Sequence, residues 1–535
     1  MIKRLLVANR GEIALRVFGT CRRLGVETVA VVAPDDAGAL HSRSADALAE
    51  IASYLDAAEI VRAARESGAD AVHPGYGFLA ESPGLAEAVE AAGLVFVGPT
   101  AEALRAAGDK VRAKEIAVEA GVPVVPWGEP AEVGFPLIVK AAAGGGGRGM
   151  RVVRDPAELD GALEAARREA EGAFGDGRVF CERYLVRPRH VEVQLLADAH
   201  GTVLAVGDRD CSVQRRHQKV VEEAPAPGLS PVLRARLHES AVAFARALGY
   251  RGAGTAEFAV EGDELHFLEL NGRIQVEHPV TELVTGLDLV EQQLRVAAGE
   301  RLDVAPETAG HAVEARLYAE DPRSFLPQAG RLERLVLPAS VRVDAGVEEG
   351  DEVGTRYDPL LAKLIAHGTT RAEALEHLAG ALAATEVEGV VTNLPFLRWL
   401  VRHRAFRDGT PTTAFLTEYP PLSPPPARLA PAVWRTPFRV NLPEPEPAPL
   451  PTVEHALDEA PAAGGPQTLT APMPGTVLRV LVKTGQQVEA REPLVVLEAM
   501  KMETPVVAPY AARVAAVHVQ EGAAVAAGAP LVDLA

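Results

Sequence analysis

Leu137-Ile138-Val139-Lys140-Ala141-Ala142-Ala143-Gly144-Gly145-Gly146-Gly147-Arg148-Gly149-Met150 is the stretch that most restricts the fold. Its first part is an apolar strand pattern that ends in a lysine, and its second part is a run of glycines. A glycine loop lets backbone N–H groups approach a phosphate because no Cβ stands in the way. The loop lacks the Gly-Lys-Ser/Thr that closes a Walker loop, so the pattern indicates a different phosphate-binding loop.

The glycine run has a plainer interpretation, since four consecutive glycines alone are more often a hinge. Lys140 stands just before the run, and a second lysine, Lys110, occurs in Gly108-Asp109-Lys110. These two cations favour phosphate binding over the hinge. Both are what an ATP-grasp fold would use.

A polar cluster follows on two predicted strands. Glu269 and Asn271 alternate along one strand and therefore face the same side, while Glu257 approaches from a neighbouring strand. Two carboxylates and an amide oxygen are hard ligands of the kind that magnesium prefers. A solvated acidic strand is the alternative interpretation. The next stretch, Gly272–Glu282, carries charged, amide and imidazole groups with little structural purpose, which favours a functional site.

The N-terminal part alternates strand and helix patterns. An apolar run at Arg4–Ala8 is followed by Asn9-Arg10-Gly11-Glu12 and a helical pattern through Arg22. Further apolar runs predict more strands, at Val26–Val32, Ala71–Pro74 and Leu94–Gly98. This alternation predicts a parallel sheet flanked by helices, Rossmann-like in layout. The first turn lacks Gly-x-Gly-x-x-Gly, which excludes a nicotinamide or flavin dinucleotide site of the usual kind.

Near the C-terminus, Lys501 lies in Glu498-Ala499-Met500-Lys501-Met502-Glu503, within a segment of valine-rich strands and glycine turns. Glycine turns stand almost symmetrically before and after the lysine, which predicts a small two-halved β-module that displays Lys501 on a hairpin. An ordinary exposed hairpin lysine is the alternative for an isolated Met-Lys-Met. The surrounding turns favour a lysine that carries a covalent prosthetic group.

Composition restricts the protein class. The chain has 535 residues, enough for several domains with large cores. Its net charge of −19 argues against nucleic acid and anionic membranes as partners. Cys21, Cys181 and Cys211 are odd in number and lack metal-ligand spacing, which fits a reducing compartment. No apolar run approaches the ~20 residues of a membrane span, so we expect a soluble, cytoplasmic protein.

The chain resembles the biotin carboxylase family over roughly Met1 to Tyr419. The most specific stretches occur in family order, at Val7–Ala14, His73–Leu79, Arg209–Lys219 and Arg273–Pro279. The segment from about Leu469 to Leu534 resembles the biotin carboxyl carrier domain of biotin-dependent carboxylases, whose modified lysine lies between two methionines. A lipoyl carrier has a similar fold, but methionine on both sides of the lysine favours biotin.

This resemblance implies an α/β multidomain fold. The implied parts are a Rossmann-like biotin carboxylase N-terminal domain (1–108), an ATP-grasp domain (109–308), an α+β biotin carboxylase C-terminal domain (309–420), a Pro/Ala-rich linker (421–466) and an all-β biotinyl/lipoyl-type hammerhead domain (467–535). The linker contains alternating prolines and acidic residues, as in Pro443–Pro451, and is expected to be an extended spacer.

The resemblance also assigns nucleotide and metal ligands. It implies ATP binding by Lys110, Lys140, Gly146, Gly147, Glu182, Arg183, Tyr184, Leu185, His190 and His217, with Glu182 to Leu185 as the hinge for the adenine. Glu257, Glu269 and Asn271 would bind Mg²⁺ or Mn²⁺, in two sites. Such ions neutralise the charge that develops on a transferred phosphoryl group.

Bicarbonate would be held by Lys219, Arg273, Gln275 and the backbone of Val276, where a guanidinium fork suits its paired oxygens. Glu277 would be the general base that removes the bicarbonate proton, so that the oxygen attacks the γ-phosphate and forms carboxyphosphate. The arginine that stabilises the biotin enolate in the family maps to Arg342. The implied catalytic set is Glu277, Arg273, Lys219 and Arg342.

The resemblance implies partners as well. A biotin protein ligase would modify Lys501, the carboxylase part would form a homo-oligomer, and a separate carboxyltransferase (β) subunit would be needed because the chain ends soon after the carrier. We expect the α-subunit of an acyl-CoA carboxylase, with acetyl-CoA ahead of propionyl-CoA and fatty acid biosynthesis as the setting. The alternatives are the carboxylase subunit of a split pyruvate carboxylase and a biotinylated scaffold with an inactive ATP-grasp part.

Several positions depart from the family pattern. The chain is about a dozen residues shorter than expected between Lys110 and Lys140, and the glycine loop begins Ala-Ala-Ala. Gly272 stands where threonine or proline is usual, and we expect it to add backbone freedom beside the metal ligands. His73 and His278 each precede a proline in a tight turn, and we expect both to be structural.

Overall fold

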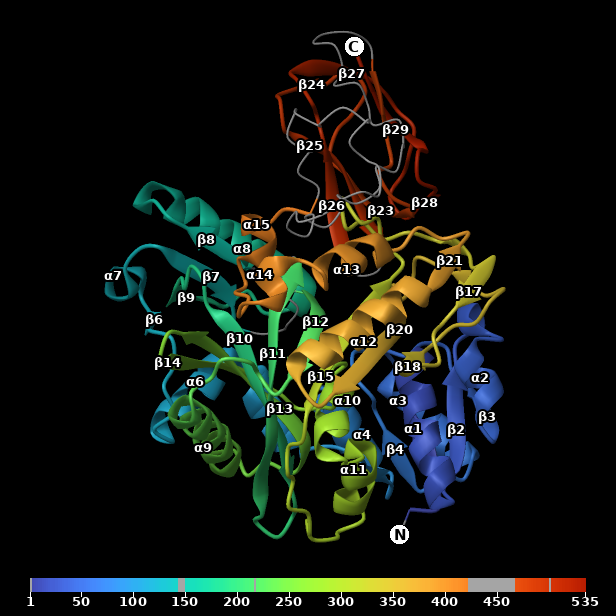
Figure 1. Cartoon of the computed structure of the whole chain (residues 1–535). Coiled ribbons are helices and arrows are strands. Elements are labelled where there is room, and N and C mark those ends of the chain that lie inside the picture. Colours follow the sequence, from blue (N-terminus) through green and yellow to red (C-terminus); the bar gives the residue numbers. More distant parts are fainter. Residues whose placement is uncertain (1, 143–149, 216–217, 422–466, 500–501) are drawn as a thin grey trace, which may run out of the picture.

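The N-terminal alternation of strand and helix patterns forms a five-stranded parallel sheet, as predicted (Figure 1). The computed structural model describes residues 2–142, 150–215, 218–421, 467–499 and 502–535. In spatial order the strands of this sheet are β3 (Ala47–Glu50), β2 (Glu27–Val32), β1 (Arg4–Val7), β4 (Ala71–His73) and β5 (Val95–Phe96).

Helix α1 (Gly11–Leu24) follows the first strand and contains a buried carboxylate in its first turn. The residue after its end, Gly25, has a φ of 70°, the left-handed conformation that glycine adopts without a steric penalty. Glu12 lies in its first turn and is buried. The N-terminal domain therefore contributes a carboxylate to the interior that it shares with later parts of the chain.

The strand before the glycine run belongs to a separate four-stranded antiparallel sheet. Its strands, in spatial order, are β6 (Trp127–Gly128), β9 (Val179–Arg183), β7 (Leu137–Ala141) and β8 (Arg151–Val153). Helix α8 (Leu159–Phe174) packs on this sheet. The predicted strand therefore exists as β7, while the glycines at 144–147 lie outside the described residues.

A single eight-stranded antiparallel sheet forms the centre of the molecule (Figure 1). Its strands, in spatial order, are β14 (Glu264–Asn271), β13 (Gly252–Glu261), β10 (Arg189–Ala197), β11 (Val203–Arg215), β12 (Gln218–Ala224), β15 (His311–Tyr318), β20 (Leu360–Gly368) and β18 (Arg342–Ala345). The pairing of β12 with β15 joins the ATP-grasp part to the C-terminal part. The sheet is therefore continuous across two regions that the sequence predicts as separate domains.

The two faces of this sheet differ in polarity where β12, β15 and β20 lie side by side. Val313, Ala315 and Leu317 on β15 belong to an apolar cluster that includes residues of helix α12 (Arg371–Ala384). The intervening Glu314 and Arg316 point to the opposite face, because successive side chains of a strand alternate. Helix α10 (His278–Thr285) packs on the same three strands. Buried charged side chains therefore lie on the face of the sheet that packs against α10, which begins within the Gly272–Glu282 stretch.

The C-terminal segment is a small all-β domain of two four-stranded sheets, as predicted (Figure 1). One contains β22 (Gln467–Thr470), β29 (Pro530–Leu534), β27 (Ala512–Val517) and β24 (Gln487–Val488), and the other β26 (Met502–Val507), β25 (Pro493–Ala499), β23 (Gly475–Val480) and β28 (Ala524–Val525). β25 and β26 pair up to Ala499 and Met502. These two residues flank the pair Met500 and Lys501, which lies outside the described residues.

Within the described residues, no helix combines the length and the apolar character needed to cross a membrane.

Candidate active site

Glu277 is the centre of the candidate site. It directly precedes α10 and is 0% exposed. Its Oε1 accepts a hydrogen bond from Lys219 Nζ at 2.7 Å, and its Oε2 accepts one from Arg316 Nη2 at 2.9 Å. Burial would raise the pKa of Glu277, but Lys219, Arg316 and Arg209 outweigh it and hold that pKa well below its usual value. The site therefore contains a buried, ionised carboxylate between two cations.

Lys219, on β12, joins three carboxylates that come from three different elements. Its Nζ lies 2.5 Å from Glu192 Oε2, 2.8 Å from Glu257 Oε1 and 2.7 Å from Glu277 Oε1. Burial would lower the pKa of this ammonium, but the three carboxylates raise it well above its ordinary value. Lys219 is therefore a fixed positive charge, suited to attract a small anion.

The expected bicarbonate group forms a connected cluster beside it. Arg273 donates from Nη1 to Gln275 Oε1 at 3.0 Å and from Nη2 to Asn271 Oδ1 at 3.0 Å. Its Nε also donates to Glu81 Oε2 of the N-terminal domain at 2.9 Å. Gln275 donates to Glu257 Oε1 at 3.3 Å. The structure thus brings Arg273 and Gln275 together and links them to the predicted metal ligands.

The predicted metal ligands lie on one face of the β13–β14 pair. Glu257 and Glu269 are directly opposite each other, and Asn271 donates to Glu257 Oε1 at 2.9 Å. Lys110, at the start of helix α6 (Lys110–Glu119), has its Nζ 3.9 Å from Glu269 Oε2. Two carboxylates and an amide make an oxygen-rich set that fits a hard divalent cation bound together with a nucleotide phosphate.

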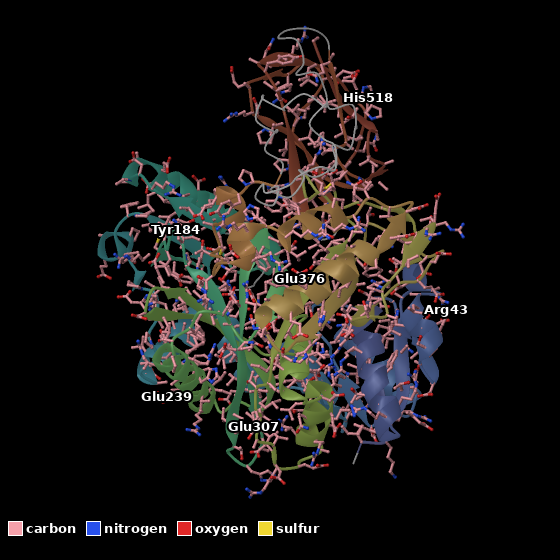
Figure 2. The ribbon with its side chains drawn as sticks, viewed as in Figure 1. Arg43, Tyr184, Glu239, Glu307, Glu376 and His518 are labelled. Atoms are coloured by element: carbon pink, nitrogen blue, oxygen red, sulfur yellow. The ribbon has the colours of Figure 1, made fainter. Side chains whose placement is uncertain are left out.

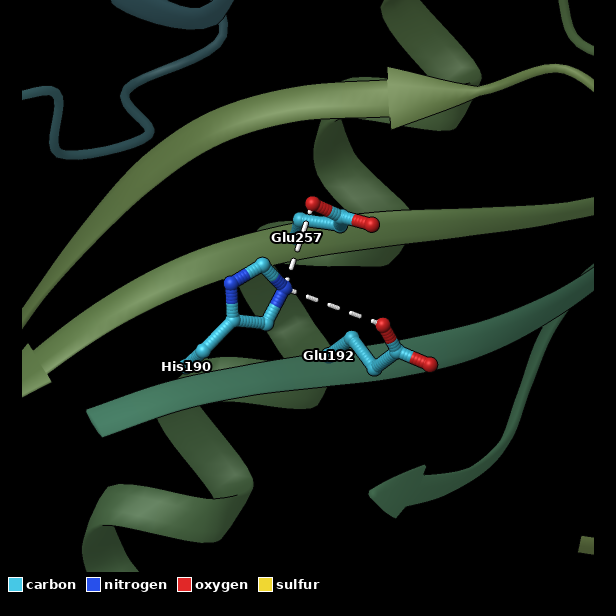
Figure 3. Close-up of side chains that lie close together, drawn as sticks. All are labelled: His190, Glu192 and Glu257. Carbon is cyan, nitrogen blue, oxygen red and sulfur yellow. Dashed lines mark ion pairs between the residues drawn. The ribbon is translucent and has the colours of Figure 1, made fainter. Parts of the chain in front are cut away.

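His190, Glu192 and Glu257 form a second close group, in which potential ligand atoms lie within 4.8 Å of one another (Figure 3). His190 Nε2 is 3.1 Å from Glu257 Oε2. Burial would lower the pKa of this imidazole, but Glu257 raises it above its ordinary value. Glu257 therefore favours the charged form of His190, which suits contact with a phosphate. Cys211 lies close to Glu192 and Glu277, and burial keeps its thiol protonated by raising its pKa.

The predicted adenine hinge, Glu182 to Leu185, begins on β9 and continues just beyond it. The Glu182 carboxylate is buried and forms ion pairs with Lys140 and, at 2.7 Å, with Lys114. Burial would raise the pKa of Glu182, but the two lysines lower it to about 2. The Arg183 N–H donates to Pro126 O, and the Tyr184 N–H donates to Pro136 O. Tyr184 lies beside the four-stranded sheet that contains β9 (Figure 2). Gly146, Gly147 and His217 lie outside the described residues.

Arg342 and Arg316 occupy different surroundings. Arg342 pairs with Glu282 Oε2 at 2.8 Å and with Asp344 Oδ2 at 2.9 Å, whereas Arg316 contacts Glu277. The sequence analysis did not single out Arg316. One signal could have found it, because Glu314 and Arg316 interrupt an otherwise apolar, fully buried strand.

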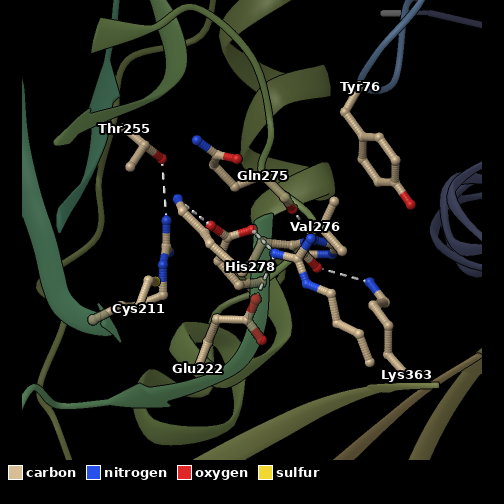
Figure 4. A network of polar contacts seen from close by, with 12 residues as sticks. Tyr76, Cys211, Glu222, Thr255, Gln275, Val276, His278 and Lys363 are labelled. Carbon is tan, nitrogen blue, oxygen red and sulfur yellow. Dashed lines mark hydrogen bonds and ion pairs between the residues drawn. The ribbon is translucent and has the colours of Figure 1, made fainter. Parts of the chain in front are cut away.

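Further buried charges were also missed by the sequence analysis. Glu222, on β12, has its Oε1 2.5 Å from Arg316 Nη2, and Lys363, on β20, donates to Val276 O at 2.8 Å (Figure 4). Lys114 forms an ion pair with Glu182. None of the three residues lies in the family-specific stretches of the sequence, so a search for motifs overlooks them.

Gly272 is constrained by its neighbours. A Cβ at this position would lie 2.7 Å from Leu104 Cδ2, and the Gly272 N–H donates to Glu81 Oε1 at 3.0 Å. The glycine therefore permits close packing of the N-terminal domain against the metal-ligand strand. The added backbone freedom expected at Gly272 stays a prediction.

His73 and His278 are both buried and neutral. His73 Nε2 is 3.2 Å from Gln293 Oε1, and its Nδ1 accepts from the Gly75 N–H at 3.0 Å. Burial lowers the pKa of His73 to about 4. His278 Nδ1 lies 2.8 Å from Gln275 O, and burial together with Lys363 lowers its pKa well below the usual value. These contacts are structural, at the last residue of β4 for His73 and at the first residue of α10 for His278.

Comparison with known protein families covers most of the chain. Residues 1–104 match the family "Biotin carboxylase, N-terminal domain", 109–305 match "Carbamoyl-phosphate synthase L chain, ATP binding domain", 314–418 match "Biotin carboxylase C-terminal domain" and 467–534 match "Biotin-requiring enzyme".

Individual proteins give the same result. The "Biotin-dependent acyl-coenzyme A carboxylase alpha3 subunit" of Mycobacterium leprae is 42% identical, over 100% of this chain and 98% of its own length. The mitochondrial methylcrotonoyl-CoA carboxylase subunit alpha of Arabidopsis thaliana is 47% identical over 78% of this chain, which spans only 61% of that relative. A crystal structure of a Campylobacter jejuni biotin carboxylase in an ATP complex has 40% sequence identity, a TM-score of 0.77 and coverage of 78% and 99% of the two chains.

The buried carboxyl of Glu222 gives a pH-dependent prediction. Burial raises its pKa from 4.5 to about 7, so its ionisation destabilises the folded state as the pH rises from 4.5 through 7. The cost is up to about 1.4 kcal/mol per pH unit in that window. We expect Glu222→Gln to increase the melting temperature Tm relative to the parent more at pH 8 than at pH 5, as measured by thermal unfolding.

Its neighbour Glu223 is the matched control. Ion pairs with His311 at 2.8 Å and Arg371 at 2.6 Å lower the pKa of Glu223 despite burial. Its stabilisation is present above pH 4.5 and disappears as the pH falls. Glu223→Gln should therefore lower Tm most at neutral pH. An effect of Glu222→Gln that has the same sign and pH dependence would contradict the assignment.

Proposed function

The chain belongs to the biotin carboxylase family, and we propose that it catalyses the ATP- and bicarbonate-dependent carboxylation of biotin attached to its own Lys501. The observation that carries this proposal is the ionised Glu277 between Lys219 and Arg316, beside Arg273 and Gln275. Such a site suits an acidic anion whose proton must be removed. The biotin-requiring domain on the same chain supplies the acceptor.

Bicarbonate deprotonation would require the cations to transfer hydrogen bonds from the surrounding carboxylates to the anion. Lys219 and Arg273 would attract the anion and take up its oxygens, which weakens their hold on the carboxylates around them. The pKa of Glu277 would then rise, so that Glu277 can accept the bicarbonate proton. The freed oxygen would form a bond to the γ-phosphorus of ATP as the bond to the bridging oxygen of ADP breaks. The products of this step would be carboxyphosphate and ADP.

The ATP and metal ligands are proposed on the same physical basis. Glu257, Glu269 and Asn271 would hold Mg²⁺ or Mn²⁺, which would neutralise phosphate charge. Positive side chains would bind the nucleotide phosphates; they are Lys110, Lys140, His190 and His217. The hinge at Glu182, Arg183, Tyr184 and Leu185 would hold the adenine, and Gly146 and Gly147 would cover the phosphates.

Biotin on Lys501 would accept the carboxyl group at its ureido nitrogen, and a biotin protein ligase would attach it. Two arginines are candidates for stabilising negative charge on the acceptor. The resemblance assigns this role to Arg342, which is held by Glu282 and Asp344. Arg316 is held as closely, by Glu222 and Glu277. We propose Arg342, because its side chain is 25% exposed and can meet an acceptor, whereas that of Arg316 is 9% exposed.

The second half-reaction would need a separate carboxyltransferase subunit. The full-length similarity to an acyl-coenzyme A carboxylase subunit, carrier included, supports an acyl-CoA acceptor over pyruvate. Adding candidate carboxyltransferase chains with acetyl-CoA, propionyl-CoA, methylcrotonoyl-CoA or pyruvate would identify the acceptor. We also propose a homo-oligomer through the carboxylase part and a cytoplasmic location. Three free, buried cysteines suit a reducing compartment.

The base assignment is tested with labelled bicarbonate. We expect Glu277→Gln to reduce both bicarbonate-dependent ATP hydrolysis and transfer of label to the biotinylated chain by about 10²-fold or more, because a neutral amide cannot accept the proton. ATP affinity, measured by calorimetry, should change little. Lys501→Ala is the control, since it should lose label on the chain yet keep ATP hydrolysis with free biotin. A biotinylated parent without turnover would favour the scaffold alternative.

The two arginines can be separated by matched substitutions. Arg342→Met should lower carboxylation of free biotin about 10²-fold or more, as expected for loss of a preorganised cation at the reacting groups. Arg316→Met should lower it less. Rates are compared at equal folded fraction, established by near-UV circular dichroism. The opposite ranking would move the role to Arg316.

A further inference from the structure

We propose that Lys363 is a positioning residue for the bicarbonate site, because it fixes the carbonyl of Val276 and thereby the orientation of Glu277 and Gln275. This inference rests on the proposed function. Lys363 is 0% exposed, and its Nζ donates to Val276 O at 2.8 Å (Figure 4). A buried hydrogen bond from an ammonium to a carbonyl is stronger than a neutral one. The peptide group between two site residues is therefore held by a fixed charge.

The strand register explains why Lys363 and Arg316 act on consecutive residues. Arg316 on β15 and Lys363 on β20 are paired directly opposite each other in the sheet. Arg316 contacts the Glu277 carboxylate, and Lys363 contacts the carbonyl of Val276, the residue before it. Two neighbouring cations on a rigid sheet thus fix both the side chain of the base and the main chain that carries it.

Two carboxylates from other parts of the fold hold Lys363 in its charged form. Glu12 Oε1, in the first turn of α1, is 3.2 Å from its Nζ, and Asp344 Oδ2, on β18, is 3.6 Å away. Burial would lower the pKa of Lys363, but Glu12, Glu314 and Asp344 raise it above the ordinary value. A buried ion cluster is weak support for stability, because apolar replacements are often as stable. Positioning of the Val276 carbonyl accounts better for this cluster.

Glu12 extends the arrangement to the N-terminal domain. It also accepts a hydrogen bond from the Tyr76 hydroxyl, and Tyr76 lies in the His73–Leu79 stretch. Through Glu12 and Lys363, the first helix and a loop of the N-terminal domain are therefore connected to the carbonyl of Val276. The ATP-side cations Lys110 and Lys140 pair instead with Glu269 and Glu182. Loss of Lys363 should therefore affect bicarbonate more than ATP.

The test compares kinetic constants of the biotinylated full chain with two substitutions. Lys363→Met removes the donor, and Lys363→Arg keeps the charge for Glu12 and Asp344 but replaces the compact ammonium with a wider planar group. We expect both to raise the KM for bicarbonate about tenfold or more, with the KM for ATP within about twofold of the parent. If only the charge mattered, Lys363→Arg would retain the parent KM, and this would overturn the proposal.

Lys114→Met is the matched control, because Lys114 is also buried (1% exposed) and paired with a carboxylate, Glu182, at 2.7 Å. It should change the KM for ATP and leave that for bicarbonate near the parent value. Equal changes in both constants for every variant would indicate general loss of structure and overturn the proposal. Should Lys363→Met not fold, Lys363→Arg decides the question alone. Turnover by the parent protein separates failure of this inference from failure of the proposed function.

Discussion

An ionised carboxylate can remain inside a protein only where cations compensate for its lost hydration, and Glu277 imposes this constraint on the whole site. Its compensation comes from Lys219, Arg316 and Arg209, on three adjacent strands of the large sheet. Arg209 and Arg316 are buried and Lys219 is half-buried, and each of these cations pairs with further carboxylates. Arg209, for example, pairs with Glu192 at 2.5 Å. Successive ion pairs and hydrogen bonds therefore connect Glu277 to the N-terminal domain.

Local periodicity predicts the parallel N-terminal sheet, β7 and the carrier module, because strand and turn patterns are properties of short segments. The stretch Gly272–Glu282 could likewise be singled out by its density of polar groups. Arg316 and Lys363 could not be placed in this way, since their contact with residues 276 and 277 depends on the register of strands that are distant in sequence. Resemblance assigned the acceptor arginine to Arg342, whereas the strand pairing brings Arg316 to Glu277. The close approach of Leu104 to Gly272 likewise cannot be read from the local sequence.

The low pKa of Glu277 creates a tension with its proposed role as a base. A carboxylate held by Lys219 and Arg316 binds a proton weakly, so it would be ineffective at removing one from a bound acid. The two are reconciled if the binding of bicarbonate raises the pKa of Glu277. An arriving anion competes for the same cations, and each hydrogen bond that Lys219 transfers to it raises the proton affinity of Glu277.

In the proposed mechanism this coupling would make the strength of the base depend on the presence of its substrate. Before bicarbonate binds, the cations would suppress the basicity of Glu277, and a water molecule near the γ-phosphate would gain little activation from it. After bicarbonate binds, the same cations would stabilise the deprotonated anion, and Glu277 could hold the proton. For the exchange to work, the carboxylate must stay within reach while its partners change. A main chain fixed at Val276 by a separate cation, Lys363, meets that requirement because this contact does not depend on the charges that move.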